Sequence, residues 1–269
     1  IGDWSSDVCS SDLQNNYRPR LADPRVGYFI TALKNFSEHN GDERFVRYIN
    51  RWHLEKADPK AEVSPPKKPI VFWIEKTVPF EYRQAIRDGI SAWNNAYRKA
   101  GFETAIEVRQ QPETTDWDPE DINYNTFRWI TSGRGFAMGP SRVNPRTGQI
   151  LDADIIFDAD FVKHWRNEFE NYMPEGIAWL SHSYDSASNT SHGQVQSSPC
   201  GCRQCNLFAG HAFQNALGSA ALATTKDSLI SEEEQKKLVQ QGLRLVAMHE
   251  VGHTLGLRHN FKGSSVASI

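Results

Sequence analysis

The chain has 269 residues, an apolar fraction of 39%, and 30 lysine and arginine side chains against 33 aspartate and glutamate side chains. This length suits one large or two small globular domains, and the near balance of charge gives no reason to expect nucleic acid as a partner. No run of about 18 apolar residues is present, so we expect no membrane span.

The first thirteen residues, Ile1 to Leu13, lack the basic head and apolar middle of a signal peptide. Their stretch DWSSDVCSSDL resembles the in-frame translation of a widely used sequencing adapter. We therefore interpret residues 1–13 as an adapter-derived artefact, with a Ser/Asp-rich disordered leader as the alternative. On this interpretation the native N-terminus lies outside the sequence.

Residues 14–66 hold two short β-like runs, VGYFITAL and RFVRYINRWHLEK, and end in a breaker-rich stretch. We expect them to be a lead-in or the end of a preceding domain, followed by a second domain over residues 67–269. The run IVFWIEK predicts a buried strand at its start. Next, the apolar spacing in VPFEYRQAIRDGISAWNNAYRKAGF predicts one amphipathic helix of about five turns.

Three more strands are predicted downstream. They are Thr104–Gln110, Tyr124–Thr131 and a strand that runs through Phe157 after a turn at Asn144–Gly148. The order strand, helix, strand, strand, strand predicts an α+β (α/β-like) fold built on one sheet. Residues 162–230 mix helical and loop signals, and we expect a partly helical insertion there.

The last predicted helix begins at a capping box, in which Glu234 follows Ser231 by three residues. It carries His249 and His253, which lie one helical turn apart and can share one ion at about 2.0–2.1 Å per bond. In a continuing helix His259, six residues after His253, would point about 120° away from it.

A bend at Gly256 removes this difficulty, because glycine at a helix end readily adopts a positive φ. We expect it to bring His259 to the same ion. Three neutral nitrogens leave a fourth position for water, which is the layout of a catalytic zinc site. Glu250 is then the expected general base. The alternative is that the helical histidines are ordinary surface or core residues without a metal. The presence of Gly256 and His259 at the motif spacing makes this alternative less favoured.

The eleven residues HEVGHTLGLRH match the zinc motif HExxHxxGxxH at each fixed position. In this motif the chain resembles the metzincin clan of zinc metallopeptidases. Five longer stretches resemble, more narrowly, a family of bacterial zinc-dependent metalloproteases with DUF5117 and DUF4953 domains. They are DPRVGYF, RWHLEK, WDPED, GPSRVNPRTGQILDADI and HEVGHTLGLRHNFKGSS, so the resemblance extends from about residue 20 to the end.

The resemblance implies a metzincin-type upper catalytic subdomain, with a twisted mixed five-stranded sheet and two long helices. It implies Zn²⁺ bound by His249, His253 and His259, Glu250 as the general base, and a protein or peptide as substrate. It also implies an edge strand near Phe136–Ser141 that pairs with the substrate, and a secreted, periplasmic or cell-envelope location in a bacterium. It specifies no oligomeric state.

Metzincins also carry a methionine turn after the third histidine. None of the three methionines, at positions 138, 173 and 248, follows His259. We therefore expect this turn and the lower subdomain to lie outside the chain, and a fragment without them to hold its metal weakly or to be inactive.

Two other functions stay open, namely a catalytically silent zinc-binding or protein-binding module and a zinc amidohydrolase acting on a non-peptide substrate. Two other stretches could hold a metal, but a simpler interpretation fits each of them better. Cys200, Cys202 and Cys205, with His211, could hold a second metal, but free thiols or one disulfide fit their spacing better. The acids of DWDPED, from Asp116 to Asp121, could bind calcium, but a solvated acidic turn is favoured. Arg258 and Asn260 flank the last histidine and are expected either to support the metal ligands or to contact the substrate.

Overall fold

The computed structural model describes residues 16–34, 45–115, 117–133, 135–171 and 231–259. These residues form two compact units. The first takes in the described residues of Ile1–Ile130, Phe136–Phe157 and Leu243–Ile269, and the second takes in those of Thr131–Gly135 and Asp158–Gly242. The predicted artefact and most of the predicted insertion lie outside the described residues.

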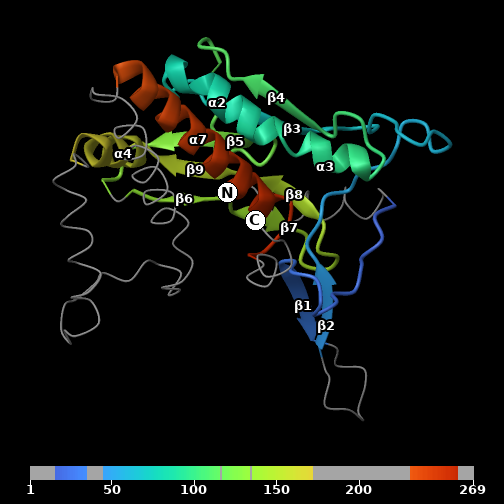
Figure 1. Ribbon diagram of the computed structural model, residues 1–269. Helices are drawn as coiled ribbons and strands as arrows, with labels where there is room; N and C mark the ends of the chain where they lie inside the picture. The colour runs from blue at the N-terminus through green and yellow to red at the C-terminus, as the bar shows by residue number, and fades with distance from the viewer. Residues whose placement is uncertain (1–15, 35–44, 116, 134, 172–230, 260–269) are drawn as a thin grey trace, which may run out of the picture. The chain divides into compact units, whose positions relative to one another are not determined.

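A mixed five-stranded sheet forms the centre of the fold (Figure 1). Its strands, in spatial order, are β4 (Ile106–Gln110), β3 (Ile70–Ile74), β5 (Asn125–Ile130), β9 (Ile155–Asp158) and β6 (Ala137–Met138). Strand β3 pairs in parallel with β4 and β5, whereas β6 pairs antiparallel with β9 at the edge. The expected five-stranded mixed sheet is therefore confirmed.

The sheet forms because its strands alternate buried and less buried side chains. In β3, Phe72 and Ile74 have no exposed surface, while Trp73 between them is only partly covered. Phe127 of β5 and Phe157 of β9 stack within the same core, with ring centroids 6.1 Å apart. Burying side chains of this size is the main stabilising contribution to such a sheet.

The prediction of a single helix of five turns is wrong. The segment forms two helices, α2 (Phe80–Ser91) and α3 (Asn94–Lys99), which are separated at Ala92 and Trp93. The Trp93 indole N–H donates to the carbonyl oxygen of Met248 at 2.7 Å, and this contact fixes the side chain where the first helix ends. The backbone there tightens, with Ala96 N–H bonding to Trp93 O at 3.0 Å.

The strand expected to run through Phe157 is also divided. Strand β8 (Ile150–Ala153) pairs with β7 (Ser141–Val143) in a separate hairpin, whereas β9 joins the main sheet. The change of partner falls at Asp154, whose carboxylate accepts hydrogen bonds from the N–H and the hydroxyl of Thr126. Because the hydrogen-bonding partner changes at Asp154, β8 and β9 are two strands in different sheets.

Near the N-terminus, β1 (Ile30–Lys34) and β2 (Phe45–Ile49) form an antiparallel pair, as the β-like runs predicted. Some of its apolar side chains are exposed, including Ile30 and Phe45.

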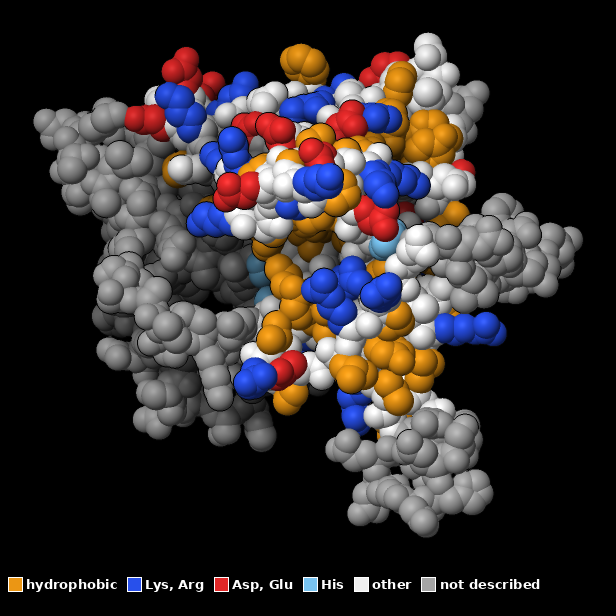
Figure 2. Space-filling view, turned by 90° about the vertical axis from the view of Figure 1, so that its right-hand side faces the viewer, with side chains coloured by type: hydrophobic (Ala, Val, Ile, Leu, Met, Phe, Trp, Pro, Cys, Tyr) orange, Lys and Arg blue, Asp and Glu red, His pale blue; other side chains and the backbone are white. Residues whose placement is uncertain are grey.

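Hydrophobic side chains gather in the lower part of the space-filling view, whereas positive and negative side chains are interspersed in its upper part (Figure 2).

Helix α7 (Glu232–Thr254) packs closely on α2. An added Cβ at Gly89 of α2 would lie 2.4 Å from the Arg244 carbonyl oxygen and 2.9 Å from the Ala247 Cβ. The backbones therefore approach one another at a point where no side chain fits.

We predict that Gly89→Ala lowers the free energy of unfolding by about 1–3 kcal/mol, because overpacking outweighs the better helix propensity of alanine. Urea unfolding measures the change. The exposed Gln84→Ala on the same helix is the control and should change stability by no more than about 0.5 kcal/mol. A more stable Gly89→Ala variant would contradict the close helix packing.

Candidate metal centre

Helix α7 begins as its capping box predicts. The Ser231 N–H donates to the Glu234 carboxylate at 3.1 Å, and the Glu234 N–H donates to the Ser231 hydroxyl at 3.3 Å. Three acids, Glu232 to Glu234, occupy the first turn, where they interact favourably with the helix dipole. These local interactions fix where the helix starts.

The other end of α7 closes in a Schellman-type turn. The N–H of Leu257 bonds to the carbonyl of Gly252 at 3.0 Å, and the N–H of Gly256 bonds to that of His253 at 2.9 Å. Gly256 has φ +94°, as the sequence predicted. A Cβ at this position would also lie 2.1 Å from the carbonyl oxygen of Asn50. Both conformation and space therefore require glycine here.

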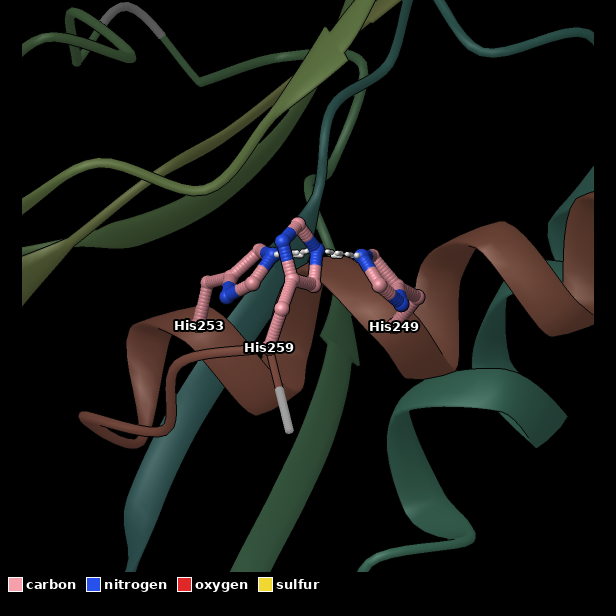
Figure 3. Close-up of side chains that lie close together, drawn as sticks. All are labelled: His249, His253 and His259. Carbon is pink, nitrogen blue, oxygen red and sulfur yellow. Dashed lines mark hydrogen bonds between the residues drawn. The ribbon is translucent and has the colours of Figure 1, made fainter. Parts of the chain in front are cut away.

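The turn brings the three histidines together. Their Nε2 atoms are 3.0 Å apart for His249 and His259, 3.1 Å for His249 and His253, and 3.2 Å for His253 and His259 (Figure 3). Tetrahedral ligands at about 2.0–2.1 Å from a metal lie about 3.3–3.4 Å from one another. The three nitrogens therefore fit a single ion, and within the described part of the chain no other group of His, Cys, Asp and Glu does so.

The protonation of His253 also suits metal binding. Its Nδ1 lies 2.8 Å from the carbonyl oxygen of Leu257, which can only accept a hydrogen bond, so Nδ1 carries the proton. The Nε2 lone pair then points toward the other two imidazoles. Burial, followed by the neighbouring His253, lowers the pKa of His259, which favours the neutral form that binds metals.

Glu250 follows His249 on α7 and is 4% exposed. Burial raises the pKa of its carboxyl to about 7, against the opposing effect of a hydrogen bond with the Gly139 backbone. Gly139 follows edge strand β6, and a Cβ there would lie 2.5 Å from the Glu250 carbonyl oxygen. Glu250 thus lies in a buried setting between the helix and this edge of the sheet.

Two residues near the site were given no role from the sequence, although the stretches DPRVGYF and RWHLEK that contain them resemble the metalloprotease family. The Trp52 indole N–H donates to the Thr254 carbonyl at 2.9 Å, in the last turn of α7. The Phe29 ring lies edge-on to the His253 ring, with centroids 5.9 Å apart. These contacts join segments far apart in the chain, so a short sequence stretch does not predict them.

The structure describes only some residues of the two alternative metal sites. The cysteine cluster, His211, Asp116 and Asn260 lie outside the described residues. Asp118 and Asp121 accept hydrogen bonds from nearby backbone N–H groups, and Glu120 forms an ion pair with Arg128. These acids form an exposed turn, as favoured above. Arg258 is exposed, and its backbone N–H donates to the carbonyl of Gly27.

Comparison with known families agrees with this geometry. Residues 231–269, which include all three histidines, match the family DUF4953, described as Met-zincin. Residues 14–57 match DUF5117, a domain of unknown function. No curated protein and no solved structure matches the chain. Among the described helices, none is both long and apolar enough to cross a bilayer. The Met-zincin match supports a zinc metallopeptidase in general.

We predict that Gly256→Ala lowers the free energy of unfolding by about 2–4 kcal/mol, because strain at positive φ adds to the clash with Asn50. It should also weaken zinc binding, measured by chelator competition. Gly133→Ala is the matched control, since Gly133 has φ +72° but nothing within 4 Å of an added Cβ. It should lose only the strain contribution of about 1–2 kcal/mol. Equal losses in the two variants would show that the Asn50 contact contributes nothing.

Proposed function

We propose that this chain carries the catalytic centre of a zinc-dependent endopeptidase. The observation that carries the proposal is the convergence of three imidazole Nε2 atoms to within 3.0–3.2 Å of one another, on a helix and the turn that follows it. The Met-zincin match over the same residues supports it. His249, His253 and His259 would hold the ion.

Zinc is the proposed ion because three neutral imidazoles with a free fourth position are the donor set of catalytic zinc sites. When bound, zinc polarises the scissile carbonyl and lowers the pKa of water, so that a nucleophile is available near neutral pH. The Leu257 carbonyl accepts a hydrogen bond from His253 and so fixes the orientation of that ring within the donor set.

Glu250 is the proposed general base. Its carboxylate would accept the proton of the attacking water and return it to the nitrogen of the departing amine. Its helical position beside His249 places it next to the metal ligands in the chain.

Strand β6 is the proposed docking edge for an extended peptide. It lies at the edge of the sheet, Met138 is 46% exposed, and the following Gly139 approaches Glu250 closely. An exposed edge can pair with a substrate backbone by strand addition. The resemblance further supports a secreted, periplasmic or envelope location, which we include in the proposal.

Two competing functions make different predictions. A silent zinc-binding module has no need of a buried carboxyl beside the ligands, so Glu250 favours an enzyme. A zinc amidohydrolase would use the same residues on another amide. The β6 edge favours a peptide, and profiling with peptides and small amides separates the two.

We predict that Glu250→Gln, in the longest native form of the protein, lowers the rate of peptide cleavage by about 10²–10⁴ because the proton acceptor is lost. Zinc content, measured by atomic emission, should be unchanged. Glu113→Gln removes an exposed carboxyl elsewhere and should cleave like the parent protein. Full cleavage by Glu250→Gln would refute the proposed role of Glu250.

Removal of one ligand should remove the metal. We predict that His253→Ala retains little or no zinc after dialysis, whereas His53→Ala, a histidine outside the triad, retains as much as the parent. Chelation should lower the thermal midpoint of the parent and not of His253→Ala. At a free zinc concentration of 100 times Kd the stabilisation is about 2.7 kcal/mol. A chelator-insensitive parent protein would contradict a metal centre.

A further inference from the structure

We infer that two short stretches near the N-terminus, residues 27–29 and 50–52, together called the N-terminal segment, are a positioning element of the metal centre, and that Phe29 is its main positioning residue. The inference rests on the proposed function only in taking the three histidines as a zinc site. It assigns a role at this site to part of the stretch that matches the domain of unknown function DUF5117.

The first contact is a short backbone ladder beside the turn after α7. The Phe29 N–H donates to the Gly256 carbonyl at 2.8 Å, and the Arg258 N–H donates to the Gly27 carbonyl at 2.8 Å. Tyr28 and Leu257 form the antiparallel bridge between these bonds. The chain leading from the helix to His259 is therefore held by the N-terminal segment as one strand holds another.

The second contact is made by the Phe29 ring itself. It meets the His253 ring edge to face, at 5.9 Å between centroids and 64° between planes. His253 is thus fixed from two sides, by the Leu257 carbonyl at Nδ1 and by an aromatic ring against its face or edge. A ring held in this way presents its Nε2 in one direction.

Residues 50–52 contact the same turn. Asn50 donates its backbone N–H to the Phe29 carbonyl at 2.8 Å, and its own carbonyl oxygen fills the space where a Cβ on Gly256 would lie. Trp52 then bonds to the Thr254 carbonyl. The Arg51 backbone pairs in turn with Gly148 and Ile150, which anchors the segment to the β7–β8 hairpin of the same unit.

These contacts matter because His259 lies outside the helix. A ligand on an unsupported turn must be ordered when the metal binds, and this ordering weakens affinity. A turn already paired with the N-terminal segment needs less ordering. The segment should therefore strengthen zinc binding although it contributes no ligand.

The test compares Phe29→Ala with Phe45→Ala in the whole chain. Phe29 directly precedes β1 and Phe45 begins β2, and their exposure is similar, 40% and 47%, but it is the Phe29 ring that contacts His253. We expect Phe29→Ala to raise the zinc dissociation constant about 10-fold or more, measured by competition with a chromophoric chelator at fixed pH. Phe45→Ala should stay within about twofold, and Phe29→Tyr, which keeps the ring, should restore affinity.

A spectroscopic readout separates positioning from general stability. The visible absorption of the cobalt-substituted protein depends on ligand directions, so Phe29→Ala should shift it and Phe45→Ala should not. Unchanged zinc affinity and an unchanged cobalt spectrum in Phe29→Ala would overturn the inference.

If Phe29→Ala does not fold, Trp52→Phe gives the answer instead. It keeps an aromatic ring and removes one donor to the last turn of α7, so the zinc dissociation constant should rise about two- to tenfold. No rise would count against the inference. All these measurements are of metal binding, so they stand even if peptide cleavage or the proposed role of Glu250 is refuted.

Discussion

The metal centre depends on one backbone constraint, the left-handed turn at Gly256. A helix alone can offer His249 and His253 to one ion, but the third nitrogen must come from outside the helical repeat. The turn supplies it within six residues, and it is locked by φ +94° and by the Asn50 carbonyl packed against the glycine. Its Leu257 carbonyl also sets the proton on His253. One turn thus decides ligand number, direction and protonation.

Close backbone packing fixes the helix that carries this turn. Three glycines lie at contact points along it: Gly89 of α2 against Arg244, Gly139 against Glu250, and Gly252 of α7 itself against the Trp93 ring. Each would clash with its neighbour if it carried a Cβ. Helix α7 is therefore held against α2 on one side and against the β6 end of the sheet on another. Packing of this density resists small displacements, which suits a site that tolerates little error in ligand position.

Local signals made most of the site predictable. The capping box at Ser231, the histidine spacing and the glycine after the helix each act within a few residues, and each is confirmed. The break at Trp93 and the division at Asp154 were not predicted, because each depends on a hydrogen bond to a distant segment. The same holds for Phe29: the stretch DPRVGYF that contains it resembles the metalloprotease family, but its residues do not show what Phe29 contacts. Its contact with His253 exists only in the folded chain.

The pairing of the N-terminal segment with the end of α7 has a consequence for biosynthesis. Trp52 and Thr254, which it joins, are 202 residues apart. Chains are made from the N-terminus at about 5–20 residues per second, and contacts this distant form slowly. The early segment must therefore wait for the histidine-bearing helix to leave the ribosome. The three histidines can therefore be held together as in the folded chain only after residue 259 has been made, although residues 27–29 and 50–52 that support them are made much earlier.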